Sequence, residues 1–236
     1  MLKADGFRES FAQASAFNRK SSFSNLTSDM TTNAASSSWR TSEFPFDLAP
    51  QRTQDADLLR QLNFVPGLKE VLALRQVHAL EHATVWVLGQ SGTTPTARSD
   101  NQLLGGMSTD QGFYLYGRVN IAQLRQAVRS AHSRIASGEW DLAVHPRCGT
   151  NLSVGMLLTA GLAVGINLAL PRGPILQLLG LGAAAAAAAQ LAPDVGALAQ
   201  RYVTTAIPFN LSVVDISVSQ DFWGREAHFV RVRWVE

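Results

Sequence analysis

Residues 148–194 read CGTNLSVGMLLTAGLAVGINLALPRGPILQLLGLGAAAAAAAQLAPD. The stretch from 148 to 171 carries no charged residue, and a second charge-free run extends from 175 to 192. Each run is close to the ~20 apolar residues that a bilayer-crossing helix needs, and the turn between them contains Pro171 and Pro174. We therefore expect residues 151–193 to form a transmembrane hairpin of two helices. The poly-alanine of 183–189 weakens the second span, and the alternative is a helical hairpin buried in a soluble core.

A helical hairpin places the residues before and after it on the same side of the membrane. Arg147 and Arg201 flank its open end, whereas its turn holds only Arg172. Arginine and lysine are enriched in cytoplasmic loops, so we expect an integral membrane protein whose soluble parts face the cytoplasm. Gly161 and Gly165 form a small-xxx-small pair, which allows close approach of one helix to another.

The flanking segments predict an α+β fold: a small mixed sheet with two soluble helices, in addition to the transmembrane hairpin. We expect an α+β soluble part over 59–150 and a C-terminal β-hairpin over 194–236 that completes it. Apolar periodicity and turn residues predict the individual elements. They are a helix over 66–88, a hairpin over 103–117, a helix over 120–138, a short strand over 141–145, and two strands around the turn at 221–224.

Residues 1–58 are rich in Ser, Asn, Thr and Ala, and this composition predicts a disordered tail. An organelle transit peptide is the alternative, although Asp5, Glu9 and Asp29 disfavour it. Met30 is an alternative start.

The net charge of the chain is only +2 and its arginines are scattered, so we expect no nucleic-acid partner. Cys148 is the only cysteine, which excludes an intrachain disulfide and leaves a free thiol, a nucleophile or a metal ligand.

The first chemical motif is HALEH at residues 78–82, within the predicted helix. Residues four apart lie on one face of a helix, so His78 and His82 can point two imidazoles at one ion. Glu81 lies beside that face and is the candidate general base, as in zinc hydrolases that carry HExxH or its inverse, or alternatively a third metal ligand. The alternative is a buried, hydrogen-bonded histidine pair without a metal.

The second motif is HPRCGTN at residues 145–151, directly before the first apolar run. Pro146 and Gly149 favour a tight bend, so His145 and Cys148 can face one point. The alternative is an ordinary turn that caps the following helix. We expect His78, His82 and Cys148 to bind a metal, with His145 as a fourth ligand or a residue behind the ligands. Mixed nitrogen and sulfur ligands favour Zn²⁺.

In combination, HALEH and HPRCGT resemble a family of bacterial membrane proteins labelled predicted metal-dependent enzymes. The span from about 71 to 208, with LGGMSTD at 104–110 and QRYVTTAIP at 200–208, also resembles a cyanobacterial family of unknown function. The resemblance implies a membrane location and a metal site, and it implies no particular reaction.

The sequence supports three functions. The first is a membrane-embedded, zinc-dependent hydrolase acting on an unknown substrate at the bilayer surface. The second is a non-enzymatic membrane assembly or scaffold protein with a structural metal site. The third is a thiol enzyme in which His145 activates Cys148. The expected partners are the lipid bilayer and an unknown membrane-associated substrate or protein. Arg147 has two interpretations, contact with lipid headgroups or binding of a substrate anion.

Overall fold

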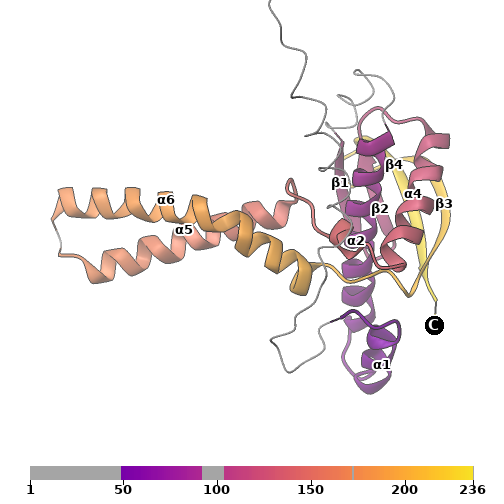
Figure 1. Cartoon of the computed structure of the whole chain (residues 1–236), viewed down its shortest axis with the longest axis horizontal. Helices are drawn as coiled ribbons and strands as arrows, with labels where there is room; N and C mark the ends of the chain where they lie inside the picture. The colour runs from indigo at the N-terminus through magenta and orange to yellow at the C-terminus, as the bar shows by residue number, and fades with distance from the viewer. Residues whose placement is uncertain (1–48, 92–103, 172, 236) are drawn as a thin grey trace, which may run out of the picture. The chain divides into compact units, whose positions relative to one another are not determined.

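A computed structural model describes residues 49–91, 104–171 and 173–235, and every element belongs to one unit, Pro50–Glu236. The fold is α+β (Figure 1). In chain order its elements are α1 (Gln54–Gln61), α2 (Leu68–Ser91), β1 (Gly105–Thr109), β2 (Gly112–Tyr116), α4 (Ile121–Ala136), η1 (Trp140–Ala143), α5 (Gly149–Ala169), α6 (Pro174–Ala199), η2 (Gln200–Thr204), β3 (Leu211–Gln220) and β4 (Glu226–Trp234). Most of the expected N-terminal tail, residues 1–48, lies outside the described residues, and its proposed boundary at 58 falls inside α1.

The four described strands form one sheet in the order β1-β2-β4-β3. All of its pairings are antiparallel, so the expectation of a mixed sheet was wrong. The expected hairpin is confirmed, because β1 and β2 pair across a turn at Asp110 and Gln111. The C-terminal strands join this hairpin, as expected, through the pairing of β2 with β4. This order leaves β1 at an edge of the sheet.

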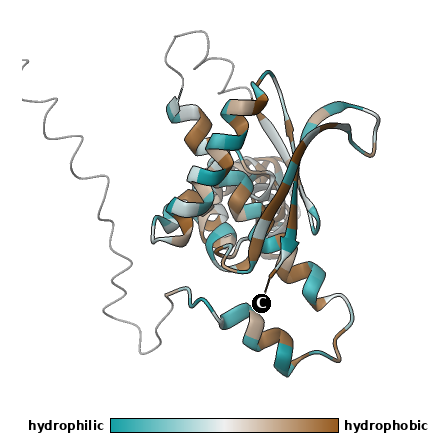
Figure 2. Ribbon diagram, turned by 90° about the vertical axis from the view of Figure 1, so that its right-hand side faces the viewer, coloured by the Kyte–Doolittle hydropathy of each residue, from teal (hydrophilic) through white to brown (hydrophobic). Residues whose placement is uncertain are grey.

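The core lies between this sheet and the helices α2 and α4, which also pack against each other. Asn120 caps α4 as expected, because its Oδ1 accepts a hydrogen bond from the backbone N–H of Ala122 at 2.8 Å. Figure 2 shows hydrophobic and hydrophilic residues alternating along the helices of this part. The largest fully buried apolar side chains of the core are those of Leu80, Phe113, Leu115, Leu124 and Ile135.

One expected helix is confirmed with shifted ends, and one expected strand is wrong. The helix expected over 66–88 begins at Leu68 and continues through Gly89, and Pro66 lies in the preceding turn. The strand expected over 141–145 is the 3₁₀ helix η1. Its short apolar run fits a strand or a helical turn equally well, and it packs mainly against α2 and α4.

The apolar runs form the antiparallel helices α5 and α6, which pack on each other. Close contacts through glycine define the pairing: Gly155 lies against Ala192, and Gly180 lies against Ile166. Gly161 and Gly165 have no neighbour within 4 Å of an added Cβ, so the small-xxx-small pair does not join the two helices.

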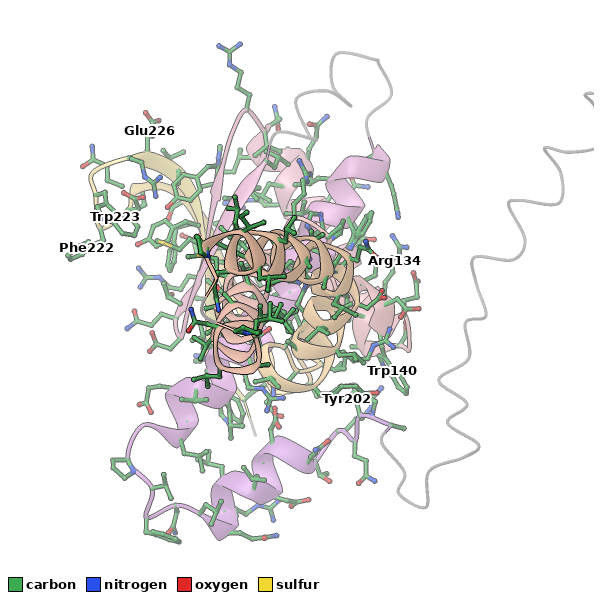
Figure 3. All side chains as sticks on the ribbon, turned by 90° about the vertical axis from the view of Figure 1, so that its left-hand side faces the viewer. Arg134, Trp140, Tyr202, Phe222, Trp223 and Glu226 are labelled. Atoms are coloured by element: carbon green, nitrogen blue, oxygen red, sulfur yellow. The ribbon has the colours of Figure 1, made fainter. Side chains whose placement is uncertain are left out.

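Most apolar side chains of α5 and α6 are exposed. Leu168 is 82% exposed and Ile175 is 74% exposed, and Figure 3 shows carbon-rich side chains surrounding the pair viewed end-on. Both helices are long and apolar enough to cross a membrane by length and composition. Among the described residues, the rest of the chain does not cover the outer faces of the pair.

The sequence pattern predicted that the second apolar helix ends at Pro193, but helix α6 continues past this residue. It runs to Ala199 and continues as the π-helix η2. The extension packs against the start of α5, where Gly196 lies against Asn151. These contacts offset the backbone hydrogen bond that a proline inside a helix removes.

Candidate metal centre

His78 and His82 lie one turn apart on α2, and their ring centroids are 4.3 Å apart. Nδ1 of His78 lies 3.0 Å from the carbonyl oxygen of Thr204, and Nδ1 of His82 lies 2.6 Å from that of Ala143. A carbonyl oxygen only accepts, so each Nδ1 carries the proton and donates it. Nε2 of each ring is then left with a free lone pair. Backbone carbonyls orient metal-binding histidines in this way in many proteins.

Cys148 brings a sulfur atom to the same point from the N-cap position of α5. Its Sγ lies 3.3 Å from Nε2 of His78 and accepts a hydrogen bond from the backbone N–H of Thr150 at 3.4 Å. Burial raises the pKa of the Cys148 thiol, but the neighbouring His82 and the hydrogen bonds with Thr150 lower it, and the net pKa lies below its ordinary value. The surroundings therefore favour the thiolate, which is the form that binds metals.

The ligand atoms of His78, His82 and Cys148 all lie within 4.8 Å of one another. A tetrahedral zinc site, with Zn–S near 2.3 Å and Zn–N near 2.05 Å, separates sulfur from nitrogen by about 3.6 Å. The 3.3 Å between Cys148 Sγ and His78 Nε2 is close to that value. The three side chains are thus compatible with a bound metal ion.

His145 lies next to this cluster and outside it. Its ring packs on Trp86 at 5.1 Å and near His82 at 5.7 Å between centroids. Its Nδ1 accepts a hydrogen bond from the backbone N–H of Arg147 at 3.2 Å. Burial lowers the pKa of His145 to about 4, and the charges of His82 and Arg147 act in the same direction. As a neutral ring it supports the turn that carries Cys148.

Glu81 is buried beside the cluster, and its oxygens are not among the ligand atoms within 4.8 Å. The hydroxyl of Ser108 donates to its carboxylate at 2.5 Å. The carboxylate also lies against the Cα of Gly106, where a Cβ would collide with it. Burial raises the pKa of Glu81, while the Ser108 hydrogen bond and the charge of His78 oppose that rise.

Gln200 and Asn151 belong to the framework of the site, and the sequence analysis did not identify either as such. Gln200, fully buried at the start of η2, accepts the backbone N–H of His145 at 2.8 Å and donates to Asn151 at 2.7 Å. Asn151 donates to the carbonyl of Pro146 at 2.8 Å. This network fixes the 145–148 turn to the ends of both apolar helices. Single glutamines and asparagines carry no spacing signal, so only the fold identifies them.

A pocket of about 440 Å³ opens beside the cluster. One wall is α2, a second is β1, and the third is the start of α5. Its lining includes His78, Glu81, His82, Gly106, Ser108 and Cys148, together with the apolar Val71 and Leu74 and the cation Arg147. Asp110, in the β1–β2 turn, is not among the residues that line it.

Fold and site together define a class of protein: an α+β domain, interrupted by an apolar helix pair, with a His–His–Cys cluster where the two parts meet. Residues 73–216 match the domain of unknown function DUF6391, so the chain belongs to that family. The chain is also 55% identical over 188 residues to an uncharacterized protein of Picosynechococcus sp.. The aligned region covers 79% of this chain and 92% of the relative. No solved structure matches the chain. These findings agree with the resemblance to a cyanobacterial family of unknown function.

Proposed function

We propose that this protein is an integral membrane zinc hydrolase, with His78, His82 and Cys148 as ligands and Glu81 as the general base. One observation carries the proposal. Three ligand atoms converge within 4.8 Å, with both histidine Nδ1 atoms engaged by backbone carbonyls, beside a pocket that also contains a buried carboxylate.

The pocket favours a catalytic role over a structural one. Structural zinc sites use four protein ligands, whereas catalytic sites use three and keep one position open. Here three residues converge, and His145, the nearest further histidine, uses its Nδ1 to accept a backbone N–H. The open side of the cluster is the pocket, which can admit water and a substrate.

Zinc bound by these ligands would polarise a substrate oxygen and lower the pKa of a coordinated water to about 7. Glu81 would take the proton of the attacking water and deliver it to the leaving group. The Ser108 hydroxyl, which donates to Glu81 at 2.5 Å, holds the carboxylate against β1 for this transfer. Arg147, at the rim of the pocket, can attract an anionic group of the substrate.

The membrane location of the proposal rests on the exposed apolar surface of α5 and α6. At a rise of 1.5 Å per residue, the 21 residues of α5 span about 31 Å, close to the ~30 Å hydrocarbon core of a bilayer. Arg147 and Arg201 flank the open end of the pair, which supports a cytoplasmic location for the site. Tyr202, 43% exposed in η2, is of a residue type enriched at membrane interfaces.

Metal analysis of the detergent-purified protein tests the first half of the proposal. We expect about one zinc per chain in the wild type, since the described residues hold one such cluster. We expect less than a tenth of that in His78→Ala and Cys148→Ala, because loss of even a residue behind the ligands lowers metal affinity by about tenfold or more. His132→Ala is the matched control and should retain zinc, because His132 bonds to the carbonyl of Pro208 outside the cluster. Wild-type protein without any bound metal would refute the site.

The variant Glu81→Gln tests the second half. It keeps a hydrogen-bond acceptor for Ser108 and removes the base, so we expect zinc to stay bound while hydrolysis falls by about 10²- to 10⁴-fold. Activity is measured on panels of peptides, carboxylic esters and phosphoesters. Zinc-loaded wild type that hydrolyses none of them would favour the scaffold function, in which the metal fastens α2 to the 145–148 turn.

The thiol enzyme remains a second candidate, with a different partner from the one expected. The thiol of Cys148 lies 3.3 Å from His78, whereas His145 accepts a backbone N–H. His78 would therefore be the base that activates the nucleophile. Full activity of a chelator-treated, metal-free preparation would favour this candidate, and inactivation by the chelator with recovery on adding zinc would exclude it.

A further inference from the structure

The strand β1 lines the pocket, and among the described residues its outer edge pairs with no other strand. In the sheet order β1-β2-β4-β3, β1 has a neighbour on one side only. Across the described residues, no other strand pairs with its outer side. Leu104, Gly105, Gly106 and Ser108 all contribute to the wall of the pocket. An edge strand presents unpaired N–H and C=O groups, and these are a template for another extended chain.

The register of the sheet identifies the backbone groups that point outward. The backbone N–H of Val232 in β4 donates to the carbonyl of Gln111 at 2.9 Å. The backbone N–H and C=O groups of the odd-numbered residues of β2 therefore point toward β4. In an antiparallel pair the direction alternates with each residue, so the even-numbered residues of β2 bond to β1. Their partners are the odd-numbered residues of β1. The N–H and C=O groups of Gly106 and Ser108 therefore point to the free edge.

The two outward-pointing residues of β1 are also the ones that touch the candidate base. The carboxylate of Glu81 lies against the Cα of Gly106 and accepts the hydroxyl of Ser108. Because Gly106 has no side chain, the carboxylate can lie directly over the strand. A chain paired with this edge would thus pass beside Glu81 and the His–His–Cys cluster on α2 and α5.

We propose that the substrate is an extended peptide segment, which binds as an additional strand on the outer edge of β1. The proposal rests on the hydrolase function and names its substrate class. Backbone pairing would supply affinity, as in other proteins that bind peptides by strand addition. Val71 and Leu74, 54% and 39% exposed on the opposite wall, favour an apolar side chain next to the bond that is cleaved.

The reaction then balances with water as the only co-reactant. The oxygen of water forms a bond to the carbonyl carbon of the peptide, and the C–N bond breaks. Glu81 takes one proton from the water and passes it to the leaving nitrogen, which departs as an amine. The second proton of the water moves from the new carboxylic acid to the amine, so the products are a carboxylate and an ammonium group.

Backbone methylation of a peptide probe tests strand addition separately from catalysis. The protein is the full-length, zinc-loaded Glu81→Gln variant in detergent. The probes are fluorescein-labelled peptides of about ten residues with central leucines, with one backbone nitrogen methylated at a time, and binding is measured by fluorescence anisotropy. We expect affinity to fall at every second position, by about fivefold for each lost hydrogen bond.

A matched pair of variants tests the protein side of the same contact. Ser108→Ala removes the hydroxyl and keeps the backbone N–H, whereas Ser108→Pro removes both. Proline is tolerated on an edge strand where the N–H faces outward. We expect Ser108→Pro to bind the peptides about fivefold more weakly than Ser108→Ala, since one backbone hydrogen bond separates them. Thermal unfolding of both variants checks that they remain folded.

The outcomes distinguish this inference from the proposed function. Period-two binding by the variant, without peptide hydrolysis by the wild type, would support strand addition and count against the hydrolase. Hydrolysis of esters or phosphoesters without peptide binding would overturn the inference and leave the hydrolase standing. Peptide binding without the period-two pattern, or equal affinity of Ser108→Pro and Ser108→Ala, would also overturn it.

Discussion

Backbone atoms on other elements orient the two histidines of α2 as candidate ligands. Carbonyl oxygens of Ala143, at the end of η1, and Thr204, at the end of η2, fix the proton on each Nδ1. Spacing of four in the sequence predicted that His78 and His82 share a face. Neither carbonyl is visible in a sequence motif, since every residue has one. The tautomers that leave each Nε2 able to bind a metal thus depend on how η1 and η2 pack against α2.

Gln200 offers a test of this framework at the level of one side chain. In Gln200→Ala the buried N–H of His145 loses its acceptor and the Oδ1 of Asn151 loses its donor, which should cost about 1–3 kcal/mol of unfolding free energy. The looser turn should also weaken zinc binding by about tenfold, as loss of residues behind metal ligands does elsewhere. Calorimetric zinc titration and thermal unfolding in detergent measure both effects.

Gln177→Ala is the matched control for that substitution. The amide of Gln177 bonds to the carbonyls of Leu170 and Pro171, at the far end of the helix pair. Its zinc affinity should equal that of the wild type. If Gln200→Ala also bound zinc normally, the Gln200 network would have no part in holding the site.

Tyr116, which lies outside the candidate metal centre, predicts how the stability of the fold depends on pH. Burial raises its pKa to about 12, and the hydrogen bond that its hydroxyl donates to Asp221 at 2.7 Å adds to the rise. The folded pKa exceeds the ordinary value of 10, so this contact stabilises the fold fully below pH 10. The contribution is lost as the pH rises through about 12.

Absorbance of tyrosinate during alkaline titration measures this shift. We expect one of the three tyrosines to ionise about two pH units later than the ordinary value. The late component should be absent in Tyr116→Phe and should move toward pH 10 in Asp221→Asn. A late component that survives Tyr116→Phe would assign the shift to another residue.

At the scale of elements, glycines decide how closely α5 and α6 approach. A Cβ on Gly180 would collide with the side chains of Ile166 and Leu170, whereas one on Gly182 would meet nothing within 4 Å. Gly180→Leu should therefore lower the unfolding free energy by about 1–3 kcal/mol, as overpacking does. Gly182→Leu should leave it nearly unchanged. Thermal unfolding followed by circular dichroism in detergent compares them, and equal losses would contradict this helix interface.

The whole molecule places its chemistry where the apolar helices meet the α+β domain. If both helices cross the membrane, the 173 turn and the sheet lie on opposite sides. In a Cys148→Ser background expressed in a bacterial host, Gly173→Cys should react with a membrane-impermeant maleimide in intact cells. Ser217→Cys, on exposed β3, should react only after lysis. Labelling of both in intact cells would contradict the predicted topology.

Local sequence determined most elements of this protein and most of its candidate ligands. Periodicity predicted α2, α4 and the two hairpins of the sheet, because the alternation of buried and exposed residues is imposed element by element. Charge-free length predicted the two apolar helices in the same way. The motifs at 78–82 and 145–148 predicted that His78, His82 and Cys148 would meet, and the structure brings them within 4.8 Å.

Tertiary structure alone decided the rest. It placed Cys148 inside the cluster and His145 beside it. It extended α6 past Pro193 into η2 and made residues 140–143 a helical turn. It also placed the free edge of β1 next to Glu81. Contacts between residues 27 to 126 positions apart in the chain produce these features. Local sequence patterns do not predict such contacts, since the contacts depend on how whole elements pack.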